Sequence, residues 1–155
     1  MGRSTRLRVI PNSIPSAKNK PFVEDDFCSE EIFKPIEEAL MGQYFSWYFN
    51  NGVAHWDDAG LGIYYFTHRL FYEGQPCSDF YNLFLPVFEQ LKVKALIRVK
   101  ANCYPFTNKI IKHDLHSDQD FDCKSALLMI NTNNGYTYLQ EHNTCVHSRR
   151  NRCIH

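Results

Sequence analysis

Residues 95–139 read ALIRVKANCYPFTNKIIKHDLHSDQDFDCKSALLMINTNNGYTYL, and their patterning predicts the sheet of this protein. Residues 97–104 alternate, as a strand exposed on one face does: Ile97, Val99, Ala101 and Cys103 would face one side, and Arg98, Lys100, Asn102 and Tyr104 the other. Residues 125–130 form a second apolar strand, and residues 136–139 are predicted to return beside it across the Asn134-Gly135 turn. The polar face of the first strand is therefore expected to line a site.

The sequence before this stretch predicts helices and further strands. Ser29 is a candidate helix cap, and the apolar residues that follow have helical spacing as far as Gly42. Strands are expected at 44–49, ending in a turn at 50–52, and at 61–72. A second helix is predicted over 78–91, kinked or shortened by Pro86. We therefore expect an α+β fold.

The composition limits the classes of protein. The chain has 155 residues, with 17 Lys+Arg and 17 Asp+Glu, so no global charge attracts it to nucleic acid or to an anionic membrane. One domain is expected over 22–155, after a flexible basic arm over 1–21 that contains Pro11 and Pro15. The sequence has neither a signal peptide nor a membrane-spanning run, which favours a cytoplasmic location. Its six cysteines form no CxxC pair, so reduced thiols are expected.

The chemistry is expected around His116 and Asp118. On a strand, these side chains would share one face, because they are two residues apart. They would then supply two ligands of a 2-His-1-carboxylate iron site, although a salt bridge at a strand end is the alternative. The same spacing at His55 and Asp57 lies in a polar, glycine-flanked stretch and is interpreted as solvated surface.

Asn102 and Tyr104 precede this pair by a short connection. Their amide and phenol can hydrogen-bond a small carboxylate beside a metal ion. The alternative for Tyr104 is a half-buried packing residue.

The run over 95–139 resembles the small 2-oxoglutarate/Fe(II)-dependent oxygenases of the prolyl-4-hydroxylase-like group, particularly short bacterial and phage members. The likeness extends more loosely through VEDDFCSEEIFKPIEEAL (23–40) and FSWYFNNGV (45–53), and so covers about 22–154. It implies a double-stranded β-helix, or jelly roll, with N-terminal helices packed on the major sheet. His116 and Asp118 would be catalytic iron ligands, with His113 as an alternative ligand, and Asn102 and Tyr104 would contact 2-oxoglutarate.

The resemblance also implies a reaction. Fe(II) and the cosubstrate 2-oxoglutarate would couple oxidative decarboxylation to hydroxylation of an unknown substrate. The expected partners are O₂ and a protein side chain or small molecule rather than nucleic acid, with no membrane involved. The cell would be a bacterium or a phage-infected host.

Members of this family carry a distal histidine and a basic residue after the His-x-Asp pair. Here the C-terminal ligand strand is expected to be missing, which would leave the domain incomplete and the third iron ligand unassigned. Substitutes for the two groups are His142, His147 or His155, and Arg149, Arg150 or Arg152. The alternative function is a non-catalytic, degenerate jelly roll that serves as a binding or structural module.

Overall fold

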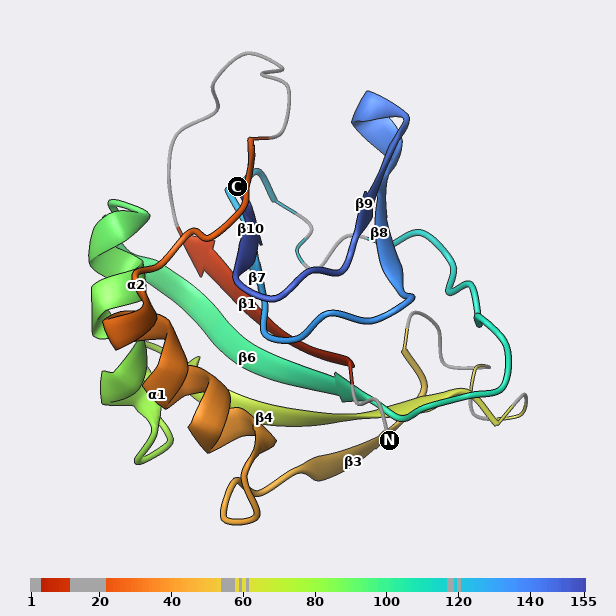
Figure 1. The fold of residues 1–155 in the computed structure, drawn as a ribbon, viewed down its shortest axis with the longest axis horizontal. Coiled ribbons are helices and arrows are strands. Elements are labelled where there is room, and N and C mark those ends of the chain that lie inside the picture. Colours follow the sequence, from red (N-terminus) through yellow and green to blue (C-terminus); the bar gives the residue numbers. More distant parts are fainter. Residues whose placement is uncertain are drawn as a thin grey trace.

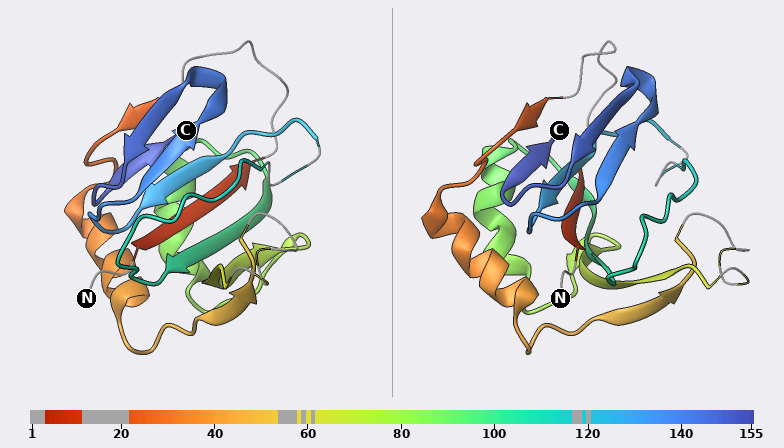
Figure 2. Two further views of the ribbon diagram at one scale, coloured as in Figure 1. Left: turned by 90° about the vertical axis from the view of Figure 1, so that its right-hand side faces the viewer. Right: turned by 45° about the vertical axis from the view of Figure 1, so that its right-hand side comes forward.

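The computed structural model describes residues 4–11, 22–53, 58, 60, 62–116, 119 and 121–155. These residues form an α+β fold in which the strands pair in antiparallel fashion and the described strands close no barrel. Two helices cover one face of a large sheet, and a two-stranded sheet lies across its other face (Figures 1 and 2). None of the helices in the described part of the chain has the length and apolar character needed to cross a membrane.

The large sheet has eight strands in the order β2-β10-β7-β1-β6-β4-β3, with β5 paired to β4. They are β1 (Ser4–Pro11), β2 (Val23–Glu24), β3 (Tyr48–Asn51), β4 (Tyr64–Tyr72), β5 (Gln75–Pro76), β6 (Leu96–Tyr104), β7 (Ala126–Met129) and β10 (Arg152–Ile154). The small sheet consists of β8 (Tyr136–Leu139) and β9 (Thr144–His147). The helices are α1 (Glu30–Met41) and α2 (Leu85–Gln90), with 3₁₀ turns η2 (Tyr81–Phe84) and η3 (Gln140–His142).

Strand β1 corrects the prediction of a flexible arm. It lies in the sheet between β6 and β7, with Ser4 opposite Tyr104 and Val9 opposite Ala126. The prolines on which the prediction rested begin only at Pro11, and residues 6–9 alternate between polar and apolar types in the sequence. The rest of the expected arm, residues 1–3 and 12–21, lies outside the described residues.

Both predicted helices are present. Helix α1 buries Phe33, Ile36 and Leu40 completely, as its apolar spacing predicts. The second helical region is divided into η2 and α2, and Pro86 lies in the first turn of α2, where a missing N–H costs no helical hydrogen bond. The predicted shortening by Pro86 is therefore confirmed.

The main core lies between the helices and the large sheet. Helices α1 and α2 contribute Phe33 and Val87, which pack with Val99 and Ala101 of β6 and Leu70 of β4. A second, smaller cluster of Met129, Val146 and Ile154 lies between the large sheet and β9. The helices therefore cover one face of β6, and its other face is left for a site.

Two strand predictions were wrong. Residues 136–139 do not pair with 125–130: β8 pairs with β9, whereas β7 lies between β1 and β10. The predicted strand over 44–49 begins only at Tyr48 and runs through Asn51, in register with β4 from Thr67 to Tyr64. Strand β8 instead forms a hairpin with the next strand, β9, across residues 140–143, and β3 begins where its pairing with β4 begins. The local turn signals identified neither the partner of β8 nor the start of β3.

Candidate functional site

The polar face of β6 opens into a cavity of about 450 Å³. Lys100, Asn102 and Tyr104 line this cavity, whereas Val99 and Ala101, on the opposite face, are fully buried. This separation follows from the alternation of side chains along a strand. The predicted polar face therefore lines a cavity.

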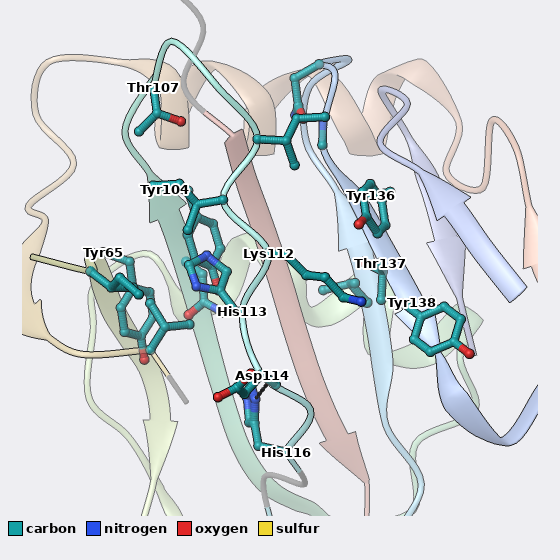
Figure 3. Close-up of a pocket in the computed structure, with 18 of the residues that line it drawn as sticks. Tyr65, Tyr104, Thr107, Lys112, His113, Asp114, His116, Tyr136, Thr137 and Tyr138 are labelled. Atoms are coloured by element: carbon teal, nitrogen blue, oxygen red, sulfur yellow. Dashed lines mark hydrogen bonds between the residues drawn. The ribbon is translucent and has the colours of Figure 1, made fainter. Parts of the chain in front are cut away.

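The segment 105–116, which has neither helix nor strand, runs over this face of the sheet (Figure 3). It contributes Lys109, Lys112, His113, Asp114 and His116 to the cavity lining. The prediction that His116 lies on a strand was therefore wrong. Most of this connection, including these five residues, lines one cavity because the segment crosses the sheet.

Asn102 has a buried polar side chain at the cavity. It is only 8% exposed, and its Oδ1 atom is buried without a hydrogen-bond partner. A buried amide oxygen without a donor costs free energy, on the order of 1–3 kcal/mol. A ligand or water that supplies a hydrogen-bond donor would remove this cost.

Tyr104 contacts aromatic rings from two elements. Its ring stacks on that of Tyr65 from β4, with centroids 5.4 Å apart and an interplanar angle of 17°. The imidazole of His113 lies 5.6 Å from the Tyr104 ring, so the 105–116 segment is held against the sheet at this point (Figure 3). Both the ligand-binding and the packing interpretation of Tyr104 agree with this arrangement.

His116 is exposed at the cavity, and its tautomer follows from its neighbour. Its Nδ1 atom lies 3.2 Å from the backbone oxygen of Asp114. Since a carbonyl oxygen only accepts hydrogen bonds, Nδ1 is the donor here, and in the neutral imidazole the lone pair is then on Nε2. A neutral imidazole with its second nitrogen held by a backbone carbonyl is the usual form of a metal-binding histidine.

Asp118 lies outside the described residues, as do His55 and Asp57. Of the four predicted site residues, the structure thus brings Asn102, Tyr104 and His116 to one cavity. Within the ranges that the structure describes, no three His, Cys, Asp or Glu side chains are grouped as metal ligands. The described cavity lining contains the imidazoles of His113 and His116 and the carboxylate of Asp114, and Asp118 was the predicted carboxylate ligand.

The wall of the cavity opposite β6 was not predicted from the sequence. Tyr136, Thr137 and Tyr138 of β8 line this wall, and Lys112 extends toward them (Figure 3). The Tyr138 hydroxyl donates to Asn143 Oδ1 at 2.9 Å. These residues were missed because β8 was expected to pair with β7, which would have placed them in the large sheet.

The cavity lining carries positive charge. Its described charged residues are Lys100, Lys109, Lys112 and Asp114, three cations against one anion when the histidines are neutral. Alternation along β6 could have indicated Lys100, but no local signal marks Lys109 or Lys112. The balance favours an anionic ligand.

The three arginines considered as carboxylate-binding groups lie in ion pairs elsewhere. Arg150 bonds both Glu30 and Glu37, and its guanidinium lies 4.6 Å from the ring centroid of Phe33. Arg149 and Arg152 both bond Asp25 at 2.8 Å. None of the three arginines lines the cavity, so this candidate assignment is wrong.

The other substitutes for the third ligand are also outside the cavity. His142 lies in η3, between β8 and β9, His147 ends β9, and the His155 imidazole is 3.7 Å from Glu24. None of the three is part of the cavity lining.

The chain matches no family model, and comparison with curated proteins and with solved structures also finds no match.

Proposed function

We propose that this protein is a 2-oxoglutarate- and Fe(II)-dependent dioxygenase that hydroxylates an as yet unidentified substrate. The observation that carries the proposal is that Asn102, Tyr104 and His116 line one cavity together with three lysines. In this proposal the large sheet and the β8-β9 sheet are the two facing sheets of a jelly roll.

The size and charge of the cavity suit 2-oxoglutarate. A volume of about 450 Å³ is within the range of small-molecule sites. The cosubstrate is a dianion at neutral pH, and Lys100, Lys109 and Lys112 would attract it. The Asn102 amide and the Tyr104 hydroxyl would hydrogen-bond its carboxylates.

His116 and Asp118 would hold the metal ion through one imidazole and one carboxylate, a donor set that suits Fe(II). His113 is the alternative imidazole, since it lines the same cavity. When bound, Fe(II) supplies the activation of O₂ that couples decarboxylation of 2-oxoglutarate to hydroxylation.

The rest of the cavity would position the substrate and limit access of water. The stacked pair Tyr65 and Tyr104 forms one wall, and Tyr136 and Tyr138 contribute rings on the β8 side. The hydrogen bond from His116 Nδ1 to the Asp114 carbonyl would make Nε2 the metal-binding atom of this imidazole. Rings at such a wall exclude water while their hydroxyls orient polar ligands.

Anaerobic absorption spectroscopy tests this proposal. Fe(II) and 2-oxoglutarate together are expected to produce a visible charge-transfer band in the wild-type protein, and His116→Ala and Asp118→Ala should each abolish it. His142→Ala is the matched control, because His142 lies outside the cavity, and it should retain the band. Absence of the band in the wild-type protein at saturating iron would contradict the proposal.

A non-catalytic binding module is the second candidate. The specific observation in its favour is that Lys100, Lys109 and Lys112 line the cavity and can attract a small anion without a metal ion. Binding of 2-oxoglutarate that is equally strong with and without Fe(II), and no charge-transfer band, would select this function.

A further inference from the structure

A second hollow lies at the edge of the large sheet formed by β3, β4 and β5. It encloses about 720 Å³ and is open to solvent. Its lining comprises Tyr44, Ser46, Tyr48, His68, Pro76, Cys77, Ser78, Asp79 and Phe80, none of which lines the first cavity. The proposed dioxygenase chemistry uses none of these residues.

A buried histidine links two groups at this hollow. His68 is 7% exposed, and its Nδ1 lies 2.7 Å from the backbone oxygen of Ser46. Because the carbonyl can only accept, Nδ1 carries the proton. The other nitrogen, Nε2, lies 2.7 Å from Ser78 Oγ and must accept the hydroxyl proton in this hydrogen bond.

Aromatic packing fixes the orientation of the imidazole. The ring of Phe45 lies 4.2 Å from that of His68, centroid to centroid, and Tyr48 and Phe80 lie 5.9 and 6.0 Å away. Ser46, His68 and Ser78 come from three different segments around β3, β4 and β5. A hydroxyl, a base and a group that orients the base, each within hydrogen-bond reach, make up the arrangement of an activated nucleophile.

We propose that Ser78 and His68 form a second reactive centre, in which Ser78 accepts the acyl group of small, uncharged esters. Ser78 Oγ attacks the ester carbonyl carbon while its proton passes to His68 Nε2. The carbon–oxygen bond to the leaving alcohol breaks, and His68 returns the proton to that alcohol. Water then attacks the acyl carbon while its proton passes to His68 Nε2. The bond from that carbon to Ser78 Oγ breaks, His68 returns the proton to Oγ, and the acyl group leaves as the acid.

The lining determines the class of ester. The described lining contains neither lysine nor arginine, so an anionic ester would have no such cation to pair with. The ionisable groups of the lining are the imidazole of His68, the thiol of Cys77, the carboxyl of Asp79 and the phenols of Tyr44 and Tyr48. The exposed ring of Tyr44 and the ring of Phe80 favour an aryl or short acyl group. The Phe80 N–H donates to Ser78 Oγ at 3.2 Å, a contact that holds the hydroxyl beside His68 Nε2.

Labelling with diisopropyl fluorophosphate tests the nucleophile. Ser78 Oγ would form a bond to phosphorus as fluoride leaves, and peptide mass mapping should locate the adduct at Ser78. A positioned general base contributes roughly 10² to 10⁴-fold, so His68→Gln should slow labelling by at least about a hundredfold. Ser78→Ala should abolish it, and p-nitrophenyl acetate should be hydrolysed by the wild-type protein but not by this variant.

The exposed Ser29, just before α1, serves as the reference in the same sample. Labelling of Ser78 at least about a hundredfold faster than that of Ser29 supports the proposal, even if His68→Gln does not fold. Equal labelling of Ser78 and Ser29, or a folded His68→Gln protein labelled as fast as the wild-type protein, would overturn it.

Discussion

The side chain of Asn151 forms two hydrogen bonds with the backbone of Cys28, which lies 123 residues earlier in the chain. Its Nδ2 donates to the Cys28 carbonyl at 2.7 Å, and its Oδ1 accepts from the Cys28 N–H at 3.0 Å. Asn151 is 1% exposed, and its backbone N–H also donates to the Met129 carbonyl. One residue thus joins the start of β10 to β7 and to the segment that precedes α1.

Replacement of Asn151 by alanine should therefore destabilise the fold. It would leave the Cys28 N–H and C=O buried without their partners, a loss of about 3 kcal/mol in the free energy of unfolding. Urea unfolding measures the change. The matched control is Asn143→Ala, because Asn143 also has a left-handed backbone but is exposed. Equal losses in the two variants would contradict a special role for Asn151.

The ion pair between Asp25 and Arg152 predicts an acid-dependent loss of stability. The hydrogen bond from Arg152 lowers the pKa of Asp25 below its ordinary value of 3.8, against an opposing effect of burial. A carboxyl whose pKa is lower in the folded state stabilises the fold above its unfolded pKa, and this stabilisation is lost as the pH falls through the folded pKa. Asp25→Asn should therefore reduce the stability at pH 7 and flatten its decline between about pH 5 and pH 2.

Unfolding by urea at a series of pH values measures this slope. Asp26→Asn is the control, because the Asp26 side chain is 74% exposed and its Oδ2 lies 3.7 Å from Arg149 Nη2, a longer contact than those of Asp25. An unchanged pH dependence in Asp25→Asn would show that the ion pair does not contribute.

The cysteines are expected to differ in reactivity. Burial raises the pKa of the Cys28 thiol to about 11 and that of Cys153 to about 12, so both remain protonated at pH 8. Cys145 is exposed, and all six cysteines are free. Ellman's reagent should therefore modify Cys145 rapidly in the native protein, and Cys28 and Cys153 only after unfolding. Rapid native modification of Cys153 would contradict the buried position of β10.

The sequence predicted the elements that depend on local patterns. The spacing of apolar residues identified α1, and the alternation in residues 97–104 identified β6 with its buried and cavity-lining faces. Pro86 correctly indicated a shortened second helix. These features need only the residues of the element itself.

The remaining features depend on contacts between distant segments. The position of β1 between β6 and β7 is set by partners far along the chain, and the Asn134-Gly135 turn does not show that β8 pairs with β9 instead of β7. For the same reason, the sequence identified Asn102, Tyr104 and His116 but not the Tyr136 and Tyr138 wall. The His68 relay was also missed, because its members are joined only through the folded sheet.

Calorimetric titration of 2-oxoglutarate into the anaerobic protein with Fe(II) tests the central claim most directly. The account predicts one equivalent bound at the cavity, with about tenfold weaker binding in Tyr104→Phe, because one hydrogen bond to a carboxylate is lost. Tyr72→Phe, whose ring contacts Arg69 outside the cavity, should bind as the wild-type protein does. Absence of 2-oxoglutarate binding by the wild-type protein at millimolar concentration, with Fe(II) present, would contradict the account.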